Sequence, residues 1–544
     1  ECRVRSFFSG ETFKLEKVRV IKDVRLVYAP PASIGEYGGE IDNWMYPRHT
    51  GDFALLRAYV SADGTSQEFN TANVPYASKN YLKISARGVD EGDFVMVLGY
   101  PGRTNRLLTM NEIDYDLTVG FQGVVDYLEH GIALIDEHTN QEDGSALKYR
   151  GTKSGYENYY KKISGQIDGA ENFQLLQYEQ ANWNKFLTFV ENELSSEDQE
   201  YLARLLSLID TQQARALPNR YGRSTLISTG KRLYRNAFEQ EKPNAERKPG
   251  YQDRDQERLL NGLRGLSYRF DPRVDQAIFL DRLLTYASFA PELRRPVYSA
   301  MLDLDAGAAA IRSKVDQIYS SQYQTPEAFL ELASMTIEQM NASADPLLVL
   351  ARETFAESLE YEADAESEGA EKQLLKSKFI KMLRAFYESE GRSIYADANG
   401  TLRVTYGNVK AVTLEDGLLY QPFTTLEGIP AKHSGQEPFN APQKLLKLID
   451  DKDYGKYEVK ALGSVPVNFI ANLDITNGNS GSATINRNFE LVGLAFDGML
   501  ETIIADYRYI PQARTISVDS RYMLWTLDKF HGAENILNEL TITN

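Results

Sequence analysis

The sequence predicts an α+β protein in which a long helical region separates two regions of β-strands. Residues 1–104 contain short strands with period-two alternation, whereas residues 105–390 carry apolar side chains at spacings of three and four. Strand patterns return from residue 391. Because short strands separated by glycine turns are typical of small β-barrels, we expect domains at 1–104, 105–390 and 391–544.

Alternating and apolar runs define the first β region. Residues 13–20 and 24–28 alternate polar and apolar side chains, and residues 54–60 and 94–98 are short apolar strands. The last of these ends in Gly99-Tyr100-Pro101-Gly102, which is a strong turn signal.

Capping residues mark the helical region. Both Ser195 and Thr325 precede acidic residues and a periodic run, as N-cap residues do. Residues 352–374 are acidic and poor in aliphatic side chains, which fits either a solvated helix or a mobile loop.

In the third region we expect strands at several short runs and a final helix. The helix is expected from about Ser520 to Leu540. The expected strands lie at 402–407, 409–412, 457–461, 465–467 and 516–518.

The composition is that of an ordinary globular protein, with 25% charged and 42% hydrophobic residues among 544. The net charge of −17 disfavours nucleic acid as a partner, because a phosphate backbone attracts a basic surface. No apolar run approaches the roughly 20 residues that span a bilayer. The lone Cys2 supports neither an internal disulfide nor a multi-cysteine metal site, and the opening without Met suggests that the chain's beginning is missing.

The most informative motif is Asn477-Gly478-Asn479-Ser480-Gly481-Ser482, which lies between two apolar runs. These residue types are common in hairpin turns, so the motif alone fits a plain turn. They can also present a serine hydroxyl and two backbone N–H groups to one point, as acyl transfer requires. In that interpretation Ser480 attacks a carbonyl, and the N–H groups of Gly478 and Ser480 stabilise the oxyanion.

A second dense motif covers residues 38–53 and places Asp, Asn, Trp, Arg and His in one glycine-bounded loop before a strand. Loops so rich in polar and aromatic side chains often carry functional sites. A carboxylate here, such as Asp52, could orient a histidine in a serine triad. The alternative is a structural loop in which Asp52 caps a turn and Trp44 packs locally.

Together, residues 42–53, the string from Gly478 to Ser482 and Gly493-Leu494-Ala495-Phe496-Asp497-Gly498 resemble serine peptidase family 46. The family includes the bacterial dipeptidyl-peptidases of types 7 and 11. The resemblance covers the whole chain and implies a chymotrypsin-like double β-barrel, here with an incomplete first barrel, and an inserted helical domain. It further implies removal of dipeptides from peptides with a free N-terminus, a periplasmic location and a homodimer.

The resemblance assigns roles to particular residues. Ser480 matches the nucleophile, Asp52 the triad aspartate, and Gly478 an oxyanion-hole donor. The residues that match the holders of the substrate amine are Asn43, Trp44, Asn158 and Asp497. Gly498 matches the first specificity pocket, where relatives that cut after Asp or Glu carry arginine, so we expect an apolar or aromatic residue before the cut.

The family's catalytic histidine has no match in this sequence. The five histidines of the chain lack the surrounding motif: His49, His130, His138, His433 and His531. We therefore expect the chain alone to be nearly inactive, either as a fragment of an active enzyme or as a natural remnant, since a serine without its base is a poor nucleophile. No metal or other cofactor is expected.

Two other functions remain open from the sequence. One is a non-catalytic protein that binds peptides in the same cleft. The other is a chymotrypsin-like endopeptidase, against which Asn43, Trp44 and Asp497 argue, because an endopeptidase does not require a free substrate amine. Labelling of Ser480 and cleavage of N-terminally blocked peptides would separate these functions.

Overall fold

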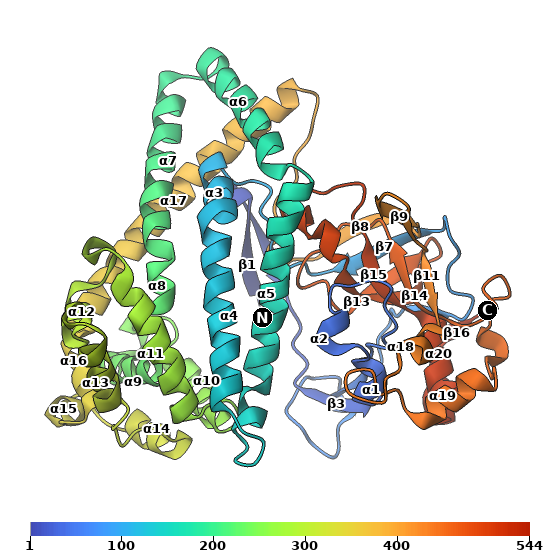
Figure 1. The fold of residues 1–544 in the computed structure, drawn as a ribbon, viewed down its shortest axis with the longest axis horizontal. Helices are drawn as coiled ribbons and strands as arrows, with labels where there is room; N and C mark the ends of the chain where they lie inside the picture. Colours follow the sequence, from blue (N-terminus) through green and yellow to red (C-terminus); the bar gives the residue numbers. More distant parts are fainter. Residues whose placement is uncertain (1) are drawn as a thin grey trace. The chain divides into compact units, whose positions relative to one another are not determined.

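The computed structural model describes residues 2–544, which divide into two compact units (Figure 1). A β-rich unit contains residues 2–108, 165–182 and 380–544. A helical unit contains Thr109–Ser164 and Trp183–Phe379. Residues 165–182, which lie inside the expected helical region, therefore pack with the β-rich unit.

The β-rich unit is built from both ends of the sequence. Before the helical insertion its elements are β1 (Cys2–Phe7), η1 (Phe8–Gly10), β2 (Thr12–Lys17), β3 (Asp23–Tyr28), α1 (Ala32–Gly35), α2 (Gly39–Asp42), β4 (Leu55–Val60), β5 (Val74–Pro75), β6 (Lys83–Ser85) and β7 (Phe94–Gly99). After the insertion they begin with β8 (Arg403–Asn408), β9 (Val412–Glu415), β10 (Leu418–Tyr420), β11 (Phe423–Thr425), α18 (Gly428–Lys432), α19 (Gln443–Asp450), η7 (Gly455–Tyr457) and β12 (Pro466–Ala471). The last elements are β13 (Ser482–Asn486), β14 (Glu490–Gly498), η8 (Leu500–Asp506), β15 (Thr515–Asp519), α20 (Ser520–Trp525), η9 (Thr526–His531), α21 (Glu534–Leu537) and β16 (Ile542–Thr543).

A nine-stranded sheet organises this unit. Seven strands follow the order β11-β12-β15-β14-β13-β7-β8; the short strand β6 pairs with β14, and β16 pairs with β6. Strands β7 and β8 pair antiparallel, with Phe94 opposite Asn408 and Gly99 opposite Arg403. The chain therefore leaves the sheet at the end of β7 for the helical insertion and returns to the neighbouring position.

The centre of the sheet is fully buried. All six residues of β12 and all five of β15 are buried, as expected for central strands covered on both faces. Helix α20 follows β15 directly and packs Tyr522 and Trp525 into the same core. Each fully buried aromatic side chain stabilises the fold by roughly 2–3 kcal/mol, so this core positions the loops at the sheet edge.

The helical unit contains fifteen α-helices in the described part of the chain, three of which cross the unit boundary. The elements up to α9 are α3 (Met110–Tyr115), η2 (Asp116–Gly120), α4 (Phe121–His138), α5 (Ser145–Asn172), α6 (Leu175–Glu193), α7 (Ser196–Ala216), α8 (Pro218–Tyr221) and α9 (Thr225–Gln240). They continue with η3 (Asn244–Glu246), α10 (Asp253–Arg264), η4 (Gly265–Tyr268), α11 (Pro272–Ser288), η5 (Pro291–Leu293) and α12 (Pro296–Met301). The remainder is η6 (Leu304–Ala306), α13 (Ala308–Ile318), α14 (Pro326–Ala333), α15 (Ile337–Ala342), α16 (Pro346–Glu353) and α17 (Phe355–Ser389).

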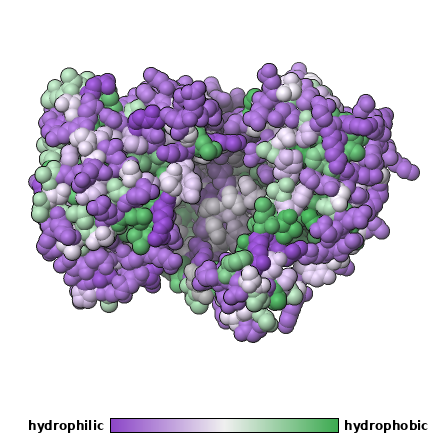
Figure 2. Space-filling view, turned by 90° about the horizontal axis from the view of Figure 1, so that it is seen from below, coloured by the Kyte–Doolittle hydropathy of each residue, from purple (hydrophilic) through white to green (hydrophobic). Residues whose placement is uncertain are grey.

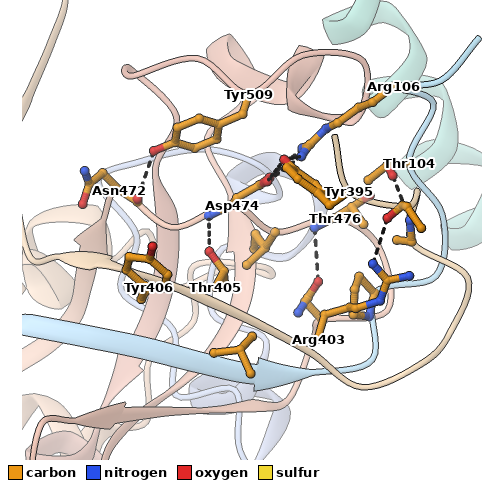
Figure 3. Close-up of a pocket in the computed structure, with 16 residues that line it drawn as sticks. Thr104, Arg106, Tyr395, Arg403, Thr405, Tyr406, Asn472, Asp474, Thr476 and Tyr509 are labelled. Atoms are coloured by element: carbon orange, nitrogen blue, oxygen red, sulfur yellow. Dashed lines mark hydrogen bonds and ion pairs between the residues drawn. The ribbon is translucent and has the colours of Figure 1, made fainter. Parts of the chain in front are cut away.

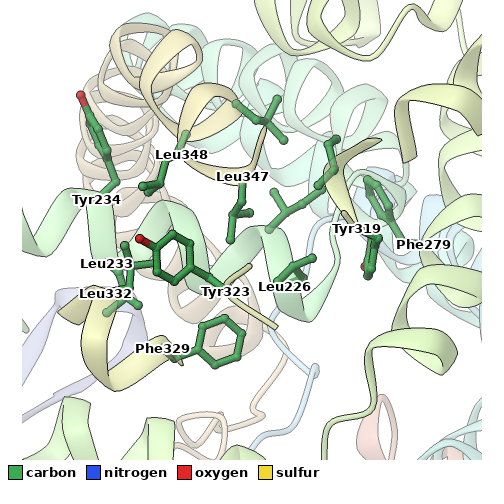
Figure 4. Packing of buried hydrophobic residues seen from close by; sticks show 14 of the residues in the cluster. Leu226, Leu233, Tyr234, Phe279, Tyr319, Tyr323, Phe329, Leu332, Leu347 and Leu348 are labelled. Carbon is green, nitrogen blue, oxygen red and sulfur yellow. The ribbon is translucent and has the colours of Figure 1, made fainter. Parts of the chain in front are cut away.

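A separate apolar core holds the helical unit together (Figure 4). Helix α9 contributes Leu226 and Leu233, and α16 contributes Leu347 and Leu348. A side chain at Gly230 would collide with Leu347 at 2.7 Å, so the glycine allows the two helices to approach closely. Both predicted N-caps are confirmed, because Ser195 accepts a hydrogen bond from Asp198 N and Thr325 accepts one from Ala328 N.

Several sequence-based expectations need correction. Residues 457–461 form a turn between Gly455 and Gly463, both with positive φ, and only an isolated Val459–Ser464 bridge remains of the expected strand. The expected final helix is divided, because Gly532 adopts a left-handed conformation after His531. For the acidic segment 352–374 the helical alternative is confirmed, because α17 covers it from Phe355 onward.

The fold class is mixed helix and sheet, and the double β-barrel stays a prediction. Within the described residues, no helix is both long and apolar enough to cross a membrane. Hydrophilic residues make up most of the outer surface on the face drawn in Figure 2.

Candidate functional site

The Ser480 motif forms a tight turn that leads into β13. Gly478 has a φ of +96°, and a Cβ there would lie 2.7 Å from Tyr100 O and 2.8 Å from Gly102 N. Only glycine fits this close approach of two backbone segments. The turn is fastened to the end of β7, because Gly102 N donates to Asn477 O at 2.6 Å.

Ser480 itself is exposed at the tip of this turn. Its Oγ donates to the backbone oxygen of Phe496 at 3.2 Å, and Gly481 N donates to Ala495 O at 2.7 Å. The hydroxyl therefore lies beside the end of β14, next to Asp497. The arrangement has the accessibility that a nucleophile needs.

Asp497 is a buried carboxylate held by several donors. Its Oδ2 accepts from Trp44 N at 2.8 Å and from the guanidinium of Arg48 at 2.9 Å, and its Oδ1 accepts from Gly498 N at 3.0 Å. Burial raises the pKa of Asp497 above its ordinary value, although the positive charge of Arg48 opposes the shift. The site thus holds a desolvated carboxylate one residue beyond the carbonyl that binds Ser480.

Arg48 links the two motifs, and sequence reasoning missed it. Besides Asp497, its guanidinium donates to the backbone oxygen of Asp42 and lies 5.2 Å from the Phe496 ring. The same charge acts on Asp52. Desolvation by the surrounding protein raises the pKa of Asp52 above its ordinary value, and the positive charge of Arg48 opposes this shift. The position of Arg48 in the dense loop was the one sequence signal for its role. Its pairing with Asp497 could not be predicted, because 449 residues separate the two.

A well-packed backbone supports the Asp52 loop. The buried side chain of Asn468 on β12 accepts from Thr50 N at 2.9 Å and donates to Thr50 O at 3.0 Å. A Cβ at Gly51 would lie 2.9 Å from the Tyr522 ring. The Asp52 side chain is exposed and makes no hydrogen bond to another described residue, so its oxygens can accept a further donor.

Trp44 and Gly498 lie together on the other side of Asp497. Trp44 has a φ of +61°, and its backbone oxygen accepts from Leu500 N at 2.8 Å. A Cβ built on Gly498 would lie 3.6 Å from the Trp44 ring, which is ordinary contact. Asn43 donates to Glu40 Oε2 at 3.0 Å. The structure thus brings Trp44, Asp497 and Gly498 into direct contact.

Asn158 belongs to the helical unit, on helix α5. Its role at the substrate amine stays a prediction. In the described part of the chain, no group of three or more His, Cys, Asp or Glu side chains is arranged to hold a metal ion.

His49 is buried despite its place in the Asp52 motif. A Cβ on Gly428 would lie 1.7 Å from His49 Nε2, so the ring lies directly on the backbone of α18. Its Nδ1 is buried without a hydrogen-bond partner. Burial, assisted by the charge of Lys432, lowers the pKa of His49 to about 3. The ring is neutral at neutral pH and is packed as a core residue.

This burial predicts an acid-sensitive fold. Because the pKa of His49 in the folded state lies below the ordinary histidine value of about 6.5, the unfolded chain binds more protons as pH falls, and unfolding becomes easier. Between pH 7 and pH 5 we expect His49 to contribute a loss of about 2 kcal/mol in the free energy of unfolding. Urea denaturation should show that His49→Gln removes this loss, whereas the exposed His138→Gln retains it. An equal loss in both variants would contradict the assignment.

Three of the other histidines are also buried or packed against neighbouring side chains. His531 packs edge-on against Tyr28 at 5.1 Å and Phe530 at 4.6 Å. His130 lies 3.4 Å from Asp281 within the helical unit. His433 has a buried Nδ1 without a hydrogen-bond partner. None of these contacts involves Ser480 or Asp52.

An exposed serine on a glycine turn beside a buried carboxylate fits a serine exopeptidase. Comparison with known proteins gives the same class. The profile of the Peptidase S46 family matches residues 1–542, and the chain belongs to this family.

Named relatives cover nearly all of this chain. An Asp/Glu-specific dipeptidyl-peptidase of Shewanella putrefaciens is 35% identical over 571 residues, covering 99% of this chain and 77% of the relative. A dipeptidyl-peptidase 7 of Phocaeicola vulgatus is 31% identical over 558 residues, covering 98% and 74%. The crystal structure of Porphyromonas endodontalis DPP11 with the dipeptide Arg-Asp matches with a TM-score of 0.81 at 26% identity, covering 99% and 77%.

Proposed function

We propose that this chain carries the nucleophile and the amine-binding site of a dipeptidyl aminopeptidase, which removes dipeptides from the free N-terminus of peptides. The observation that carries the proposal is the position of Asp497, buried beside the exposed Ser480. A buried carboxylate binds an ammonium strongly because little water competes. Arg48 is bonded to Oδ2 of Asp497, whereas Oδ1 accepts from Gly498 N and is the oxygen that we propose for the substrate amine. Fixing the amine near the nucleophile sets how many residues lie before the cut.

In the proposed reaction, Ser480 Oγ attacks the carbonyl carbon of the second residue. A base takes the hydroxyl proton, and the backbone N–H groups of Gly478 and Ser480 bind the oxyanion. The C–N bond then breaks, the leaving amine takes the proton, and the dipeptide remains as an ester on Ser480. Water hydrolyses this ester. Asp52 orients the base and stabilises its positive charge.

The proposal also gives a role to one residue of the helical unit and states a location and an oligomeric state for the enzyme. Asn158 contributes to holding the amine, together with Asn43 and Trp44. The enzyme works on peptides in the periplasm as a homodimer, with a double β-barrel fold. Cell fractionation and light scattering test the location and the assembly.

The described histidines do not contact Ser480 or Asp52, so we propose that the 544-residue chain has little activity by itself. The nearest ring in sequence, His49, is packed on Gly428 with its pKa lowered to about 3 by burial. The function is therefore tested first by binding. With Ser480→Ala, calorimetry should detect peptides with a free amine and not their N-acetyl forms; equal binding of both would refute the proposal.

We propose further that the residue before the cut is apolar or aromatic. Gly498 contributes no charge, and the Trp44 ring lies against it. The nearby Arg514 cannot supply a cation readily, because its guanidinium donates to the backbone oxygens of Lys410, Ala411, Pro511 and Ala513. Other family members are named Asp/Glu-specific dipeptidyl-peptidases, and the proposed preference would separate this chain from them.

Gly498→Arg should reverse this preference. A Cβ fits at Gly498, and an added guanidinium would pair with an acidic side chain in a partly buried site. We expect dipeptides ending in Asp to gain at least tenfold in affinity and those ending in Phe to lose affinity, measured by calorimetry. Gly262→Arg, at an open helical glycine, is the control and should change neither. Preference of the unmodified chain for Asp would contradict the assignment.

A further inference from the structure

A cavity of about 530 Å³ lies next to the Ser480 turn, within the β-rich unit (Figure 3). Its volume falls in the roughly 300–1,000 Å³ range of ligand pockets. Thr476 and Asn479, from the turn that carries Ser480, form one wall. Strand β8 and the two segments that lead to and from the helical insertion form the others.

The sheet order places this cavity across the nucleophile from Asp497. At one edge of the sheet, β14 ends at Gly498, β13 begins at Ser482, β7 ends at Gly99 and β8 begins at Arg403. Neighbouring strands are about 4.8 Å apart, so β8 lies about 10 Å beyond β13. An extended peptide advances about 3.4 Å per residue, so two or three residues cover that distance.

The wall is continuous with the nucleophile turn. Thr476 N donates to Asn479 Oδ1 at 3.3 Å, and Asn479 N donates to Thr476 O at 3.1 Å. Asn479 is buried and precedes Ser480 directly. A group bound in the cavity therefore lies against the same turn that carries Ser480.

The charged groups of the cavity are already engaged. Arg106 binds both carboxylate oxygens of Asp474, at 2.6 and 2.7 Å, which neutralises this pair. Arg403 donates to the backbone oxygens of Ala396 and Asp397 at 2.8 and 2.9 Å. A ligand here gains little from a charge of its own, because these groups already have strong partners.

Three tyrosines from separate segments supply the remaining recognition surface. The side chains of Tyr395 and Tyr406 are 60% and 72% exposed, and Tyr509 donates to Asn472 O at 3.0 Å. Exposed aromatic rings around a cavity are typical of sites that bind aromatic or aliphatic side chains, because burying them removes a large apolar area from water.

We propose that this cavity binds the leaving part of the substrate, namely the first two residues after the cut, and prefers uncharged aromatic or aliphatic side chains there. This inference rests on the proposed function, since the amine at Asp497 and the bond at Ser480 set the direction of the peptide. The tyrosines of the cavity then determine specificity beyond the released dipeptide.

Calorimetry on the Ser480→Ala chain tests this site. The two probes are the amides Ala-Phe-NH₂ and Ala-Phe-Tyr-Leu-NH₂, which share the amine and the first two residues. We expect the longer probe to bind at least tenfold more tightly. Tyr406→Ala and Tyr395→Ala should each remove about tenfold of this gain without changing the affinity of the short probe, and Tyr406→Phe should keep it.

The outcomes separate the two proposals. If the short probe binds and the longer one binds no more tightly, the cavity does not receive the leaving part. If neither probe shows amine-dependent binding, the proposed function itself is wrong. Tyr268→Ala, which removes an 81% exposed ring of the helical unit, is the matched control; loss of the gain in this variant would also refute the role of the cavity.

Discussion

Ser480 of this chain should react with a fluorophosphonate about 10⁶-fold more slowly than the serine of a complete triad. The structure presents Ser480 on an exposed turn, but no histidine in the described part of the chain is hydrogen-bonded to it. The hydroxyl instead donates to Phe496 O at 3.2 Å, which neither accepts its proton nor raises its nucleophilicity. Mass spectrometry of the labelled chain over time measures this rate.

An added base should restore part of the rate. Asp52 is exposed and makes no hydrogen bond to another described residue, so we expect imidazole from solution to take the place of the unmatched histidine. We expect labelling to rise with imidazole concentration, to fall in Asp52→Asn and to vanish in Ser480→Ala, whereas Ser482→Ala serves as the control. Rapid labelling without imidazole would show that a group of the chain already acts as the base.

Local patterns predicted much of the fold. Period-two alternation located β2 and β3, and the apolar run before Gly99 located β7, because these signals depend on neighbouring residues alone. The strand expected at 457–461 failed, since the flanking glycines Gly455 and Gly463 both take positive φ and turn the chain. An apolar pattern cannot show whether a partner strand lies beside it.

The site was predicted in part. The motifs indicated Ser480, Asp497 and Trp44, and the structure brings the last two into a hydrogen bond of 2.8 Å. Arg48 escaped notice because its role depends on contacts with Asp497 and Phe496 far along the chain. The cavity beside the turn was not predicted for the same reason, because its walls come from four segments that meet only in the folded sheet.

Asp497→Asn should weaken binding of a peptide with a free amine about a hundredfold, since a buried charge partner contributes roughly 2–5 kcal/mol. The variant preserves shape and the hydrogen bond from Trp44 N, but it also removes the ion pair with Arg48, so a control for that change is needed. N-acetyl peptides should bind equally to both proteins. Asp519→Asn is the matched control, because Asp519 is also a buried carboxylate paired with an arginine, Arg521. An equal loss in this control would assign the effect to the fold.

The charge of Asp497 also predicts how the affinity for the peptide depends on pH. Burial raises the pKa of Asp497 above the ordinary value of 3.8, so its negative charge disappears at a higher pH than that of an exposed aspartate. Affinity should fall as pH decreases through this pKa, and should fall again above about pH 8, where the peptide amine loses its proton. Asp497→Asn removes the charge at every pH, so its weak binding should lack the acid limb. An acid limb that persists in Asp497→Asn would place the amine at another carboxylate.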